Sequence, residues 1–376
     1  MLSLFAGMGG LDLGAHMAGL RVVLALDSDR SALDVISAGL AVPTLRAESQ
    51  TARPRPVIAA AGLRTDGSAI LIGGPPCTAF SHAGFWLEHK RNGEDAQADR
   101  IADYCRFLSA LKPRAFVMEN VPGLLFETHR GVFNSFVKRV RKLGYHTSWQ
   151  VLNAADFGVP QARRRLIVVG MKAQQAYQFP VGGFSGAPRT AGWAFKNLPS
   201  NGKEAEPDEE LGGKYSTLLK RIPEGGNYLV FTKERGYRAP KFKWRSRYWS
   251  FLLKLDRKMP SPTIAATRIS NNGPFHWHNR RLRLHELARL QGIPDELPLH
   301  ASLERARRHL GNAVPPLLAA QLFWSLRAQL GEVKQADLPD CIGAALEMEA
   351  SAAQVSKAIA RALPKASIPR IEIDVR

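Results

Sequence analysis

Cysteine is scarce in this chain. Cys77, Cys105 and Cys341 are the only three in 376 residues, and no two of them form a Cys-x-x-Cys pair. Isolated cysteines argue against a disulfide framework and against a structural zinc site, and they fit a reducing compartment. We therefore expect no bound metal and a protein of the reducing cytosol.

Long hydrophobic runs are also missing. The longest apolar runs have the length of a strand, so the sequence predicts no transmembrane helix. The N-terminus lacks a basic region followed by an apolar stretch and a small-residue cleavage site, so we expect no signal peptide. An apolar fraction of 45% and a charged fraction of 23% are typical of a soluble globular protein. The length allows a large domain and a smaller one.

Acidic residues are few relative to basic ones. The chain has 52 Lys and Arg against 33 Asp and Glu, a formal net charge of +19, which indicates a polyanionic partner, usually nucleic acid and less often a membrane surface. Residues 235–281 hold twelve Lys or Arg against the single acid Asp256. Interleaved aromatics suit phosphate contacts and wedging into a duplex, although a small domain with an aromatic core and a solvated basic face would look the same. The aromatics are Tyr237, Phe242, Trp244, Tyr248, Trp249, Phe251, Phe275 and Trp277.

A glycine-rich turn follows the first predicted strand, residues 1–5, and leads into an amphipathic helix. Strand, turn and helix in this order hold nucleotide-like cofactors. Asp27 ends a second predicted strand, where an acid can accept both hydroxyls of a ribose. A dinucleotide and S-adenosylmethionine both fit. Asp12 stands where the dinucleotide pattern has its third glycine, and an acid there would repel a pyrophosphate but not a sulfonium. Residues 43–68 read as irregular, and Glu48 either ends a short strand beside the adenine or is a surface acid.

The stretch 73–81 carries the strongest signal. It follows a buried-type strand at 69–72 and places two glycines and two prolines before Cys77. Open α/β sheets bind ligands at the carboxyl ends of their strands, although a lone Pro-Cys is more often a turn with a buried cysteine. The polar residues 82–99 are either a disordered surface loop or a mobile lid, and their position after Cys77 favours the lid.

Two further strand ends place charged residues on the same predicted rim. Glu119 ends the apolar strand 115–118, and it lies on the rim with Cys77 if the sheet is parallel. Three arginines precede the strand 166–170, and burying them unpaired would be costly. Strand alternation puts Arg163 and Arg165 on one side and Arg164 on the other, while one solvated face of an edge strand is the alternative.

Six short motifs resemble, in order and spacing, the signatures of the DNA (cytosine-5)-methyltransferases. The resemblance runs from residue 1 to about 325. Two positions depart from the family pattern, Thr78 where Gln is usual and Arg283 where Thr is usual. The motifs are Phe5-Ala6-Gly7-Met8-Gly9, Pro75-Pro76-Cys77, Glu119-Asn120-Val121, Gln161-x-Arg163-x-Arg165, Arg289-Leu290-Gln291-Gly292 and Gly311-Asn312-Ala313-Val314-Pro315.

The resemblance implies an α/β fold, a Rossmann-like S-adenosylmethionine-dependent methyltransferase sheet with a second, smaller target-recognition domain. It places a catalytic and cofactor-binding domain at 1–180, the target-recognition domain at 181–294, and a hinge with a helix returning to the catalytic domain at 295–330. A C-terminal extension at 331–376 lies outside the resemblance. This tail is Ala-rich and partly helical, and it is either an oligomerisation helix or frayed.

The resemblance also implies the site residues. Cys77 is the nucleophile, Glu119 grips the cytosine amidine edge, Arg165 meets its O2 and Arg163 orients Glu119. Substrate contacts are implied for Ser81, Asn120 and Gln161, and no metal is expected. The implied contacts to S-adenosylmethionine are Phe5, Ala6, Gly7, Met8, Gly9, Gly10, Leu11, Asp27, Ser28, Glu48, Gly74, Pro76, Asn312 and Ala313.

The chemistry of these residue types fits independently. Carbon 5 of cytosine is a poor nucleophile, and adding a thiolate to C6 makes C5 enamine-like. The attack pushes electrons into N3, where a carboxyl with a raised pKa can donate. A base stacked in a duplex cannot be approached from both faces, so the target cytosine must flip out.

We therefore expect a sequence-specific enzyme acting on double-stranded DNA, as a monomer, in the prokaryotic cytosol or at the nucleoid. It belongs either to a restriction-modification system, with a restriction endonuclease acting separately, or works alone. A tRNA cytosine-5 methyltransferase of the same fold is the alternative, and the long basic segment weighs against it. A catalytically silent DNA-binding relative is the third hypothesis, and intact Cys77 and Glu119 weigh against that.

Overall fold

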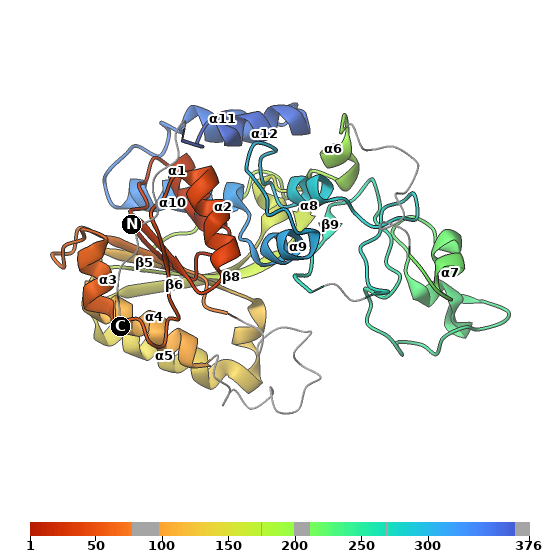
Figure 1. Cartoon of the computed structure of the whole chain (residues 1–376), viewed down its shortest axis with the longest axis horizontal. Coiled ribbons are helices and arrows are strands. Elements are labelled where there is room, and N and C mark those ends of the chain that lie inside the picture. Colours follow the sequence, from red (N-terminus) through yellow and green to blue (C-terminus); the bar gives the residue numbers. More distant parts are fainter. Residues whose placement is uncertain (77–97, 174, 199–210, 268–269, 365–376) are drawn as a thin grey trace.

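A seven-stranded sheet forms the centre of the larger lobe (Figure 1). The structure, a computed structural model, describes residues 1–76, 98–173, 175–198, 211–267 and 270–364. The strand order is β3-β2-β1-β4-β5-β8-β6, and β8 runs antiparallel to both of its neighbours. The other strand pairs of the sheet are parallel. The strands are β1 (Leu2–Leu4), β2 (Leu24–Asp27), β3 (Thr44–Arg46), β4 (Ile70–Gly73), β5 (Ala115–Asn120), β6 (His146–Asn153) and β8 (Arg164–Met171).

The order of the strands reverses between β1 and β4, which pair in parallel with Leu4 opposite Gly73. The chain leaves both strands at the same edge of the sheet. This is the topological switch point, where open α/β sheets bind their ligands. It brings the glycine-rich turn after β1 beside the residues that lead to Cys77. The α/β fold class predicted from the sequence is confirmed.

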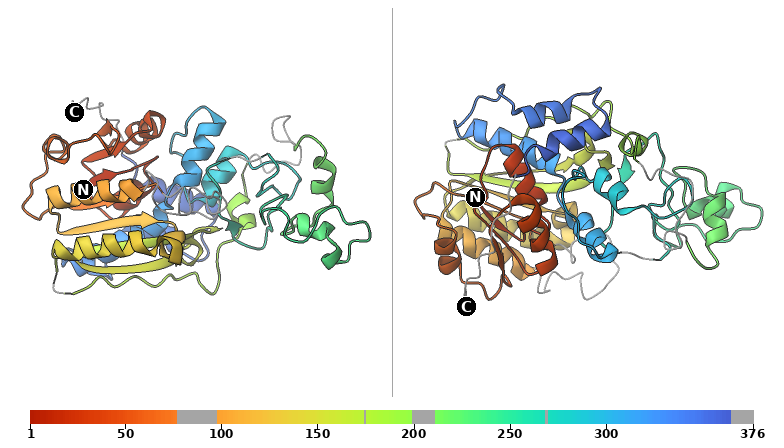
Figure 2. Two further views of the ribbon diagram at one scale, coloured as in Figure 1. Left: turned by 90° about the horizontal axis from the view of Figure 1, so that it is seen from below. Right: turned by 45° about the horizontal axis from the view of Figure 1, so that its top comes forward.

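Helices cover both faces of the sheet, and each face has its own core (Figures 1 and 2). Alternation along β4 shows the division, because Ile70 and Ile72 belong to one core and Leu71 to the other. Helices α1 (Gly10–Met17), α2 (Arg30–Leu40) and α10 (Pro316–Gln329) line the first core. Helices α3 (Pro54–Ala60), α4 (Ala98–Leu111) and α5 (Arg130–Lys142) line the second.

Helices α1 and α10 pack closely, although 298 residues lie between the end of α1 at Met17 and the start of α10 at Pro316. A Cβ atom added at Gly10 would overlap the carbonyl oxygen of Val314, and one added at Gly14 would overlap the Cβ of Ala319. Glycine is therefore required at both positions for this approach. The predicted return of the C-terminal helix to the first domain takes this form.

The smaller lobe, at the right of Figure 1, has a separate hydrophobic cluster made of residues between Leu211 and Phe275. This cluster falls inside the predicted target-recognition range 181–294, whose boundaries stay a prediction. Parts of that range, including Phe195, Leu255 and Leu287, join the large core instead. The remaining elements of this half are α6 (Ala191–Phe195), α7 (Ser216–Arg221), β9 (Ser261–Pro262), which pairs with β7 (Gln161–Ala162), α8 (Leu284–Leu290) and α9 (Leu303–Asn312).

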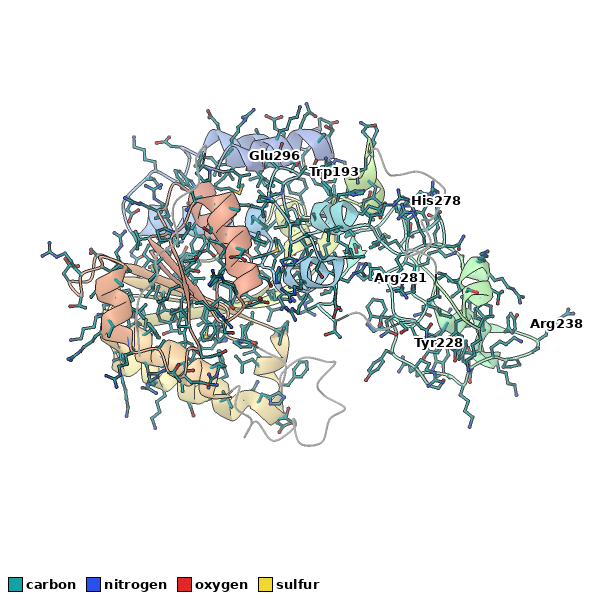
Figure 3. All side chains as sticks on the ribbon, in the orientation of Figure 1. Trp193, Tyr228, Arg238, His278, Arg281 and Glu296 are labelled. Carbon is teal, nitrogen blue, oxygen red and sulfur yellow. The ribbon has the colours of Figure 1, made fainter. Side chains whose placement is uncertain are left out.

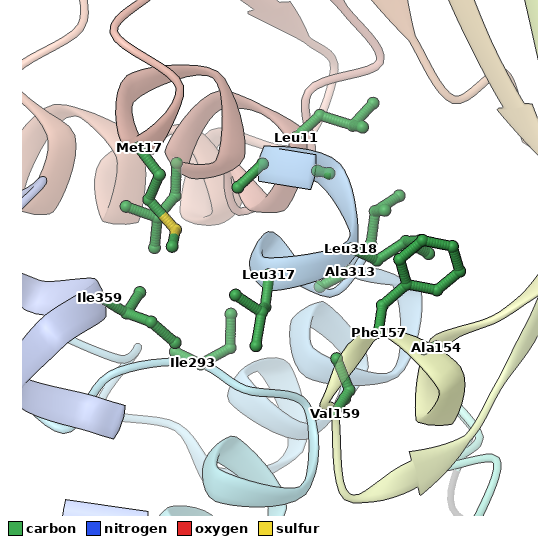
Figure 4. Packing of buried hydrophobic residues seen from close by; sticks show 14 of the residues in the cluster. Leu11, Met17, Ala154, Phe157, Val159, Ile293, Ala313, Leu317, Leu318 and Ile359 are labelled. Carbon is green, nitrogen blue, oxygen red and sulfur yellow. The ribbon is translucent and has the colours of Figure 1, made fainter. Parts of the chain in front are cut away.

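The C-terminal extension packs against the large core. Ile342 on α11 (Asp340–Leu346) and Ile359 on α12 (Ala352–Ala360) are buried there. Figure 4 shows Ile359 close to Ile293 and Leu317. The frayed alternative is therefore wrong for residues 340–360, because these helices cover apolar side chains of α10 and its neighbours. No helix in the described ranges is long and apolar enough to span a membrane.

Two sequence expectations for local structure need correction. Residues 43–68 are not irregular throughout, because they contain β3 and α3, and α3 begins at a proline in the first helical turn. Asp12 does not face a cofactor as an exposed acid, because this residue in the first turn of α1 is 0% exposed. The argument from Asp12 against a pyrophosphate is therefore wrong.

Candidate active site

An acid and an arginine form the centre of the site at the carboxyl end of β5. Arg165 Nε lies 2.8 Å from Glu119 Oε1, and each side chain is 11% exposed. Glu119 is the next-to-last residue of β5, and Arg165 is the second residue of the adjacent antiparallel strand β8. The predicted alternation is confirmed, since Arg163 and Arg165 point inward while Arg164 is exposed. The pair is a charge-assisted contact in a largely water-excluded position.

The surroundings of Glu119 raise the pKa of its carboxyl. Burial raises the pKa of Glu119, and the nearby guanidinium groups of Arg165 and Arg163 oppose part of that rise. Desolvation penalises the charged form of a carboxyl, so the net direction is towards a proton held at higher pH than usual. A carboxyl in this state can donate a hydrogen bond or a proton to a ligand.

The chain that leads to Cys77 lies directly beside this acid. A Cβ atom added at Gly74 would lie 2.9 Å from Glu119 Oε2, so a side chain there would press on the carboxyl. Asn120 Nδ2 donates to the carbonyl of Pro75 at 3.2 Å, while its Oδ1 accepts from the backbone of Val121. Residues 74–76 are thus fixed next to Glu119. The predicted nucleophile Cys77, together with Thr78, Ser81 and the lid proposed for residues 82–99, lies outside the described residues, apart from the backbone of 98–99 at the start of α4.

The side chains of Gln161 and Arg163 form buried hydrogen bonds to segments that lie far away in the sequence. Gln161 is 0% exposed, donates to Leu290 O and Gln291 Oε1, and accepts from Ile264 N at 3.0 Å. Arg163 is also 0% exposed, and its guanidinium donates to the carbonyl of Gly311 at 2.8 Å. The predicted substrate contact of Gln161 has no exposed atom to support it. Both side chains join β7 and β8 to the segments at 264, 290 and 311.

The glycine-rich turn forms a cradle held by Asp27. The two carboxylate oxygens of Asp27 accept from the backbone N–H groups of Gly7 and Asp29, each at 2.8 Å. Phe5, Gly7 and Gly9 have positive φ angles of 53°, 54° and 86°. Burial raises the pKa of Asp27, and these backbone donors oppose the rise. A carboxylate oxygen accepts more than one hydrogen bond, so Asp27 retains acceptor capacity for a ribose.

The remaining predicted cofactor residues surround this cradle unevenly. Asn312 is exposed, Ala313 is buried, and Val314 packs against Gly10 at the start of α1. Residues 312–314 are therefore brought to the turn after β1 from the far end of the chain. Ser28 and Glu48 are both exposed, and Glu48 lies two residues beyond β3. Of the predicted residues in and after the turn, Met8, Gly9, Gly10 and Leu11 are buried.

One polar cluster at the cradle was not predicted. Asp29 caps α2, accepts from Ser31 N and Oγ, and lies 3.2 Å from His309 Nε2 and 3.0 Å from Arg308. Burial alone would raise the pKa of Asp29, but the hydrogen bonds from Ser31 and the proximity of His309 lower it to about 2. The cluster ties α2 to α9. Its sequence signal is the Asp-x-Ser cap, whereas the partners on α9 have no local signal.

Comparisons with known proteins agree with this geometry. A family model for C-5 cytosine-specific DNA methylases matches residues 1–327. The chain is 37% identical over 364 residues to the type II methyltransferase M.SacI of Streptomyces achromogenes, covering 88% of this chain and 93% of that protein. It is 31% identical to M.NgoFVII of Neisseria gonorrhoeae, covering 87% and 86%. A solved prophage-encoded protein of E. coli shares the fold with a TM-score of 0.64 at 24% identity, covering 88% of this chain and 99% of that one.

The match spans the predicted cofactor, acid and arginine motifs and most of the length of these relatives. The family and the enzyme class predicted from the sequence are therefore confirmed. The chain belongs to the C-5 cytosine-specific DNA methylases, the DNA (cytosine-5)-methyltransferases.

Proposed function

We propose that the chain transfers a methyl group from S-adenosylmethionine to C5 of a flipped-out cytosine in duplex DNA, through a covalent bond between Cys77 and C6. The observation that carries the proposal is the buried pair of Glu119 and Arg165 beside Gly74, three residues before Cys77. The acid and the guanidinium lie beside the chain that leads to Cys77. They suit N3 and O2, where charge develops on the cytosine when a thiolate bonds to C6.

The cradle fits the proposed methyl donor. The donor would supply a methyl group on a sulfonium, which is ready to be taken by a carbon nucleophile. The backbone of residues 5–11 would hold it, and Asp27 would accept from its ribose. Space beside the turn is open, since a Cβ at Gly7 would meet no atom within 4 Å. The fuller set proposed to contact it is Phe5, Ala6, Met8, Gly9, Gly10, Leu11, Ser28, Glu48, Gly74, Pro76, Asn312 and Ala313.

Three side chains of this chain would then each act at a different atom of the cytosine. The Cys77 thiolate forms the bond to C6, and later leaves by elimination when the proton at C5 is removed. Glu119, with its raised pKa, gives a proton or a strong hydrogen bond to N3 as the electrons arrive there. Arg165 stabilises the charge on O2. Each such contact is worth roughly 3 kcal/mol in a water-excluded site.

Three further residues have positioning roles in this proposal. Asn120 fixes the carbonyl of Pro75 and so sets the path of the chain towards Cys77. Arg163 contributes its charge beside Glu119 and holds Gly311. Gln161 joins β7 to Gln291. We assign Gln161 to positioning rather than to a substrate contact, because its amide is fully used and 0% exposed.

Duplex DNA is the proposed substrate, and a restriction-modification system the proposed setting. The relatives are named type II methyltransferases, and the chain carries a net charge of +19. A separately acting restriction endonuclease would be the functional partner, and a monomer in the cytoplasm the working form. The tRNA alternative shares the acid, thiol and arginines, so an experiment must separate the two.

A trapping experiment tests the chemistry and the substrate together. The protein is incubated with S-adenosylmethionine and either duplex DNA or a tRNA, each carrying 5-fluorocytosine at the target positions. Because fluorine cannot be eliminated from C5, we expect a denaturation-resistant complex with duplex DNA and none with tRNA. Cys77→Ala should abolish the complex and the methylation while retaining DNA binding. Trapping by the Cys77→Ala variant, or on tRNA alone, would refute the proposal.

A further inference from the structure

Exposed aromatic side chains are concentrated in one loop of the smaller lobe. Trp244, Tyr248 and Trp249 are 37%, 48% and 58% exposed. They are three of the nine large hydrophobic side chains that are exposed in the described parts of the chain, and they lie within six residues of one another. The other aromatics of 235–281 are different, because Phe251, Phe275 and Trp277 are buried and Tyr237 and Phe242 are half-buried. The structure therefore divides a set that the sequence leaves undivided.

The backbone of this loop is held by hydrogen bonds from the side chains of Asn227 and Tyr228. The hydroxyl of Tyr228, a residue that is 1% exposed, donates to Arg247 O at 2.8 Å and accepts from Arg247 N at 3.1 Å. Asn227 Nδ2 donates to Trp249 O at 2.7 Å. Figure 3 labels Tyr228 in this lobe, with Arg238 projecting from its outer end. The loop therefore presents its apolar side chains outward from a fixed base, which lowers the entropy lost on binding.

Positive charge alternates with these aromatics. Lys241, Lys243, Arg245 and Arg247 occupy every second position, all four are exposed, and no acid occurs between Glu234 and Asp256. The guanidinium carbons of Arg235 and Arg245 lie 5.9 and 5.8 Å from the ring of Trp244. Such cation–π contacts hold both charges next to an exposed ring. Phosphates and flat or apolar base and sugar surfaces are the ligand groups that suit this combination.

We propose that residues 241–249 form the loop by which the chain reads duplex DNA. Tyr248 and Trp249 enter a groove and contact base edges and sugars, and Lys243, Arg245 and Arg247 contact the flanking phosphates. This proposal rests on the proposed function, because its ligand is the DNA in which the target cytosine lies. It goes further in naming the residues that select the sequence around that cytosine.

The proposed base and sugar contacts of the aromatic side chains are tested with Trp249→Ala and Tyr248→Ala. The matched control is Trp149→Ala, which removes a 40% exposed tryptophan at the edge strand β6 of the other lobe. Binding of fluorescent 30-base-pair duplexes is measured by anisotropy, after thermal unfolding shows that each variant is folded. We expect at least tenfold weaker binding for the two loop variants, a matching rise in KM with little change in kcat, and no change for the control.

Specificity is read by sequencing methylated cytosines in a library of random duplexes. Trp249→Ala should methylate additional sequences, whereas the control should keep the wild-type pattern. Arg247→Ala should instead weaken binding to all sequences alike and lower the slope of log K against log salt by about one. Unchanged binding and an unchanged pattern in both aromatic variants would overturn the proposal.

The binding arm separates this proposal from the proposed chemistry. It is carried out with Cys77→Ala and without a methyl donor, so it reports on the loop even if no cytosine is methylated. Loop-dependent binding of tRNA in place of duplex DNA would overturn the proposal. A change in sedimentation of Trp249→Ala without a change in DNA binding would also overturn it, because the loop would then be a contact between copies of the chain.

Discussion

At the scale of single residues, the protonation of Glu119 carries the clearest consequence. Replacing it with Gln keeps the size and a hydrogen-bond donor but removes the transferable proton. We expect the rate of methyl transfer to fall by about 10² to 10³, with DNA binding nearly unchanged. Because the proposed role of Glu119 needs its protonated form, its contribution should be present below its raised pKa and lost as pH rises through it.

Single-turnover methylation between pH 5.5 and 8.5 checks this prediction. The alkaline fall in rate that belongs to Glu119 should be absent from Glu119→Gln. A variant that keeps the wild-type rate would show that the buried acid has no part in the transfer.

Asp12 gives a second prediction at this scale, on stability. Burial raises its pKa from the ordinary 3.8 to about 7. Between those values the unfolded chain has released the proton and the folded chain has kept it, so this group lowers the free energy of unfolding as pH rises from about 4 to 7. Asp12→Asn should therefore unfold at a higher temperature than wild type at pH 8, with the difference shrinking towards pH 4.5. Calorimetry across this range measures it, and a constant difference would contradict the raised pKa.

At the scale of elements, Arg189 connects the C-terminal extension to the large core. Its guanidinium donates to the carbonyls of Gly158, Ala345 and Glu347 at 2.8 to 3.1 Å. It also lies 4.5 Å from the ring of Trp193, and it is 5% exposed. Arg189→Met leaves three carbonyls without this donor, so we expect a loss of about 3 to 5 kcal/mol in stability. The exposed Arg139→Met is the control. Thermal unfolding measures the loss of stability, and limited proteolysis measures the exposure of the tail. An unchanged unfolding temperature together with an unchanged rate of tail cleavage would contradict the prediction.

The elements also show what local sequence can predict. Strands β4, β5 and β8 follow from apolar runs, because strands buried on both faces are hydrophobic along their length. Helix α9 was missed, since four of its ten residues are Glu304, Arg305, Arg307 and Arg308, and its buried face depends on partners far away in the chain. The site motifs were predicted because their order and spacing along the chain resemble a family pattern. The hydrogen bonds that occupy the side-chain amide of Gln161 and the burial of Asp12 were not predicted, because both depend on the segments that pack against these residues.

At the scale of the whole molecule, most of the net positive charge and the proposed catalytic pair lie in different environments. Residues 235–281 carry more than half of the net charge of +19, and most of these side chains are exposed. Contacts of exposed charges with phosphates release counterions, so they weaken steeply with salt. Glu119 and Arg165 are only 11% exposed, and salt screens such a buried pair much less.

We therefore expect kcat/KM on duplex DNA to fall by roughly 10³ between 50 and 200 mM KCl if at least six phosphates are contacted. At saturating DNA, kcat should change by less than about twofold, because the transfer takes place where ions do not reach. Initial rates at four salt concentrations and several DNA concentrations separate the two constants. A kcat that fell in step with kcat/KM would mean that salt reaches the acid and its arginine, and that binding and transfer depend on the same exposed charges.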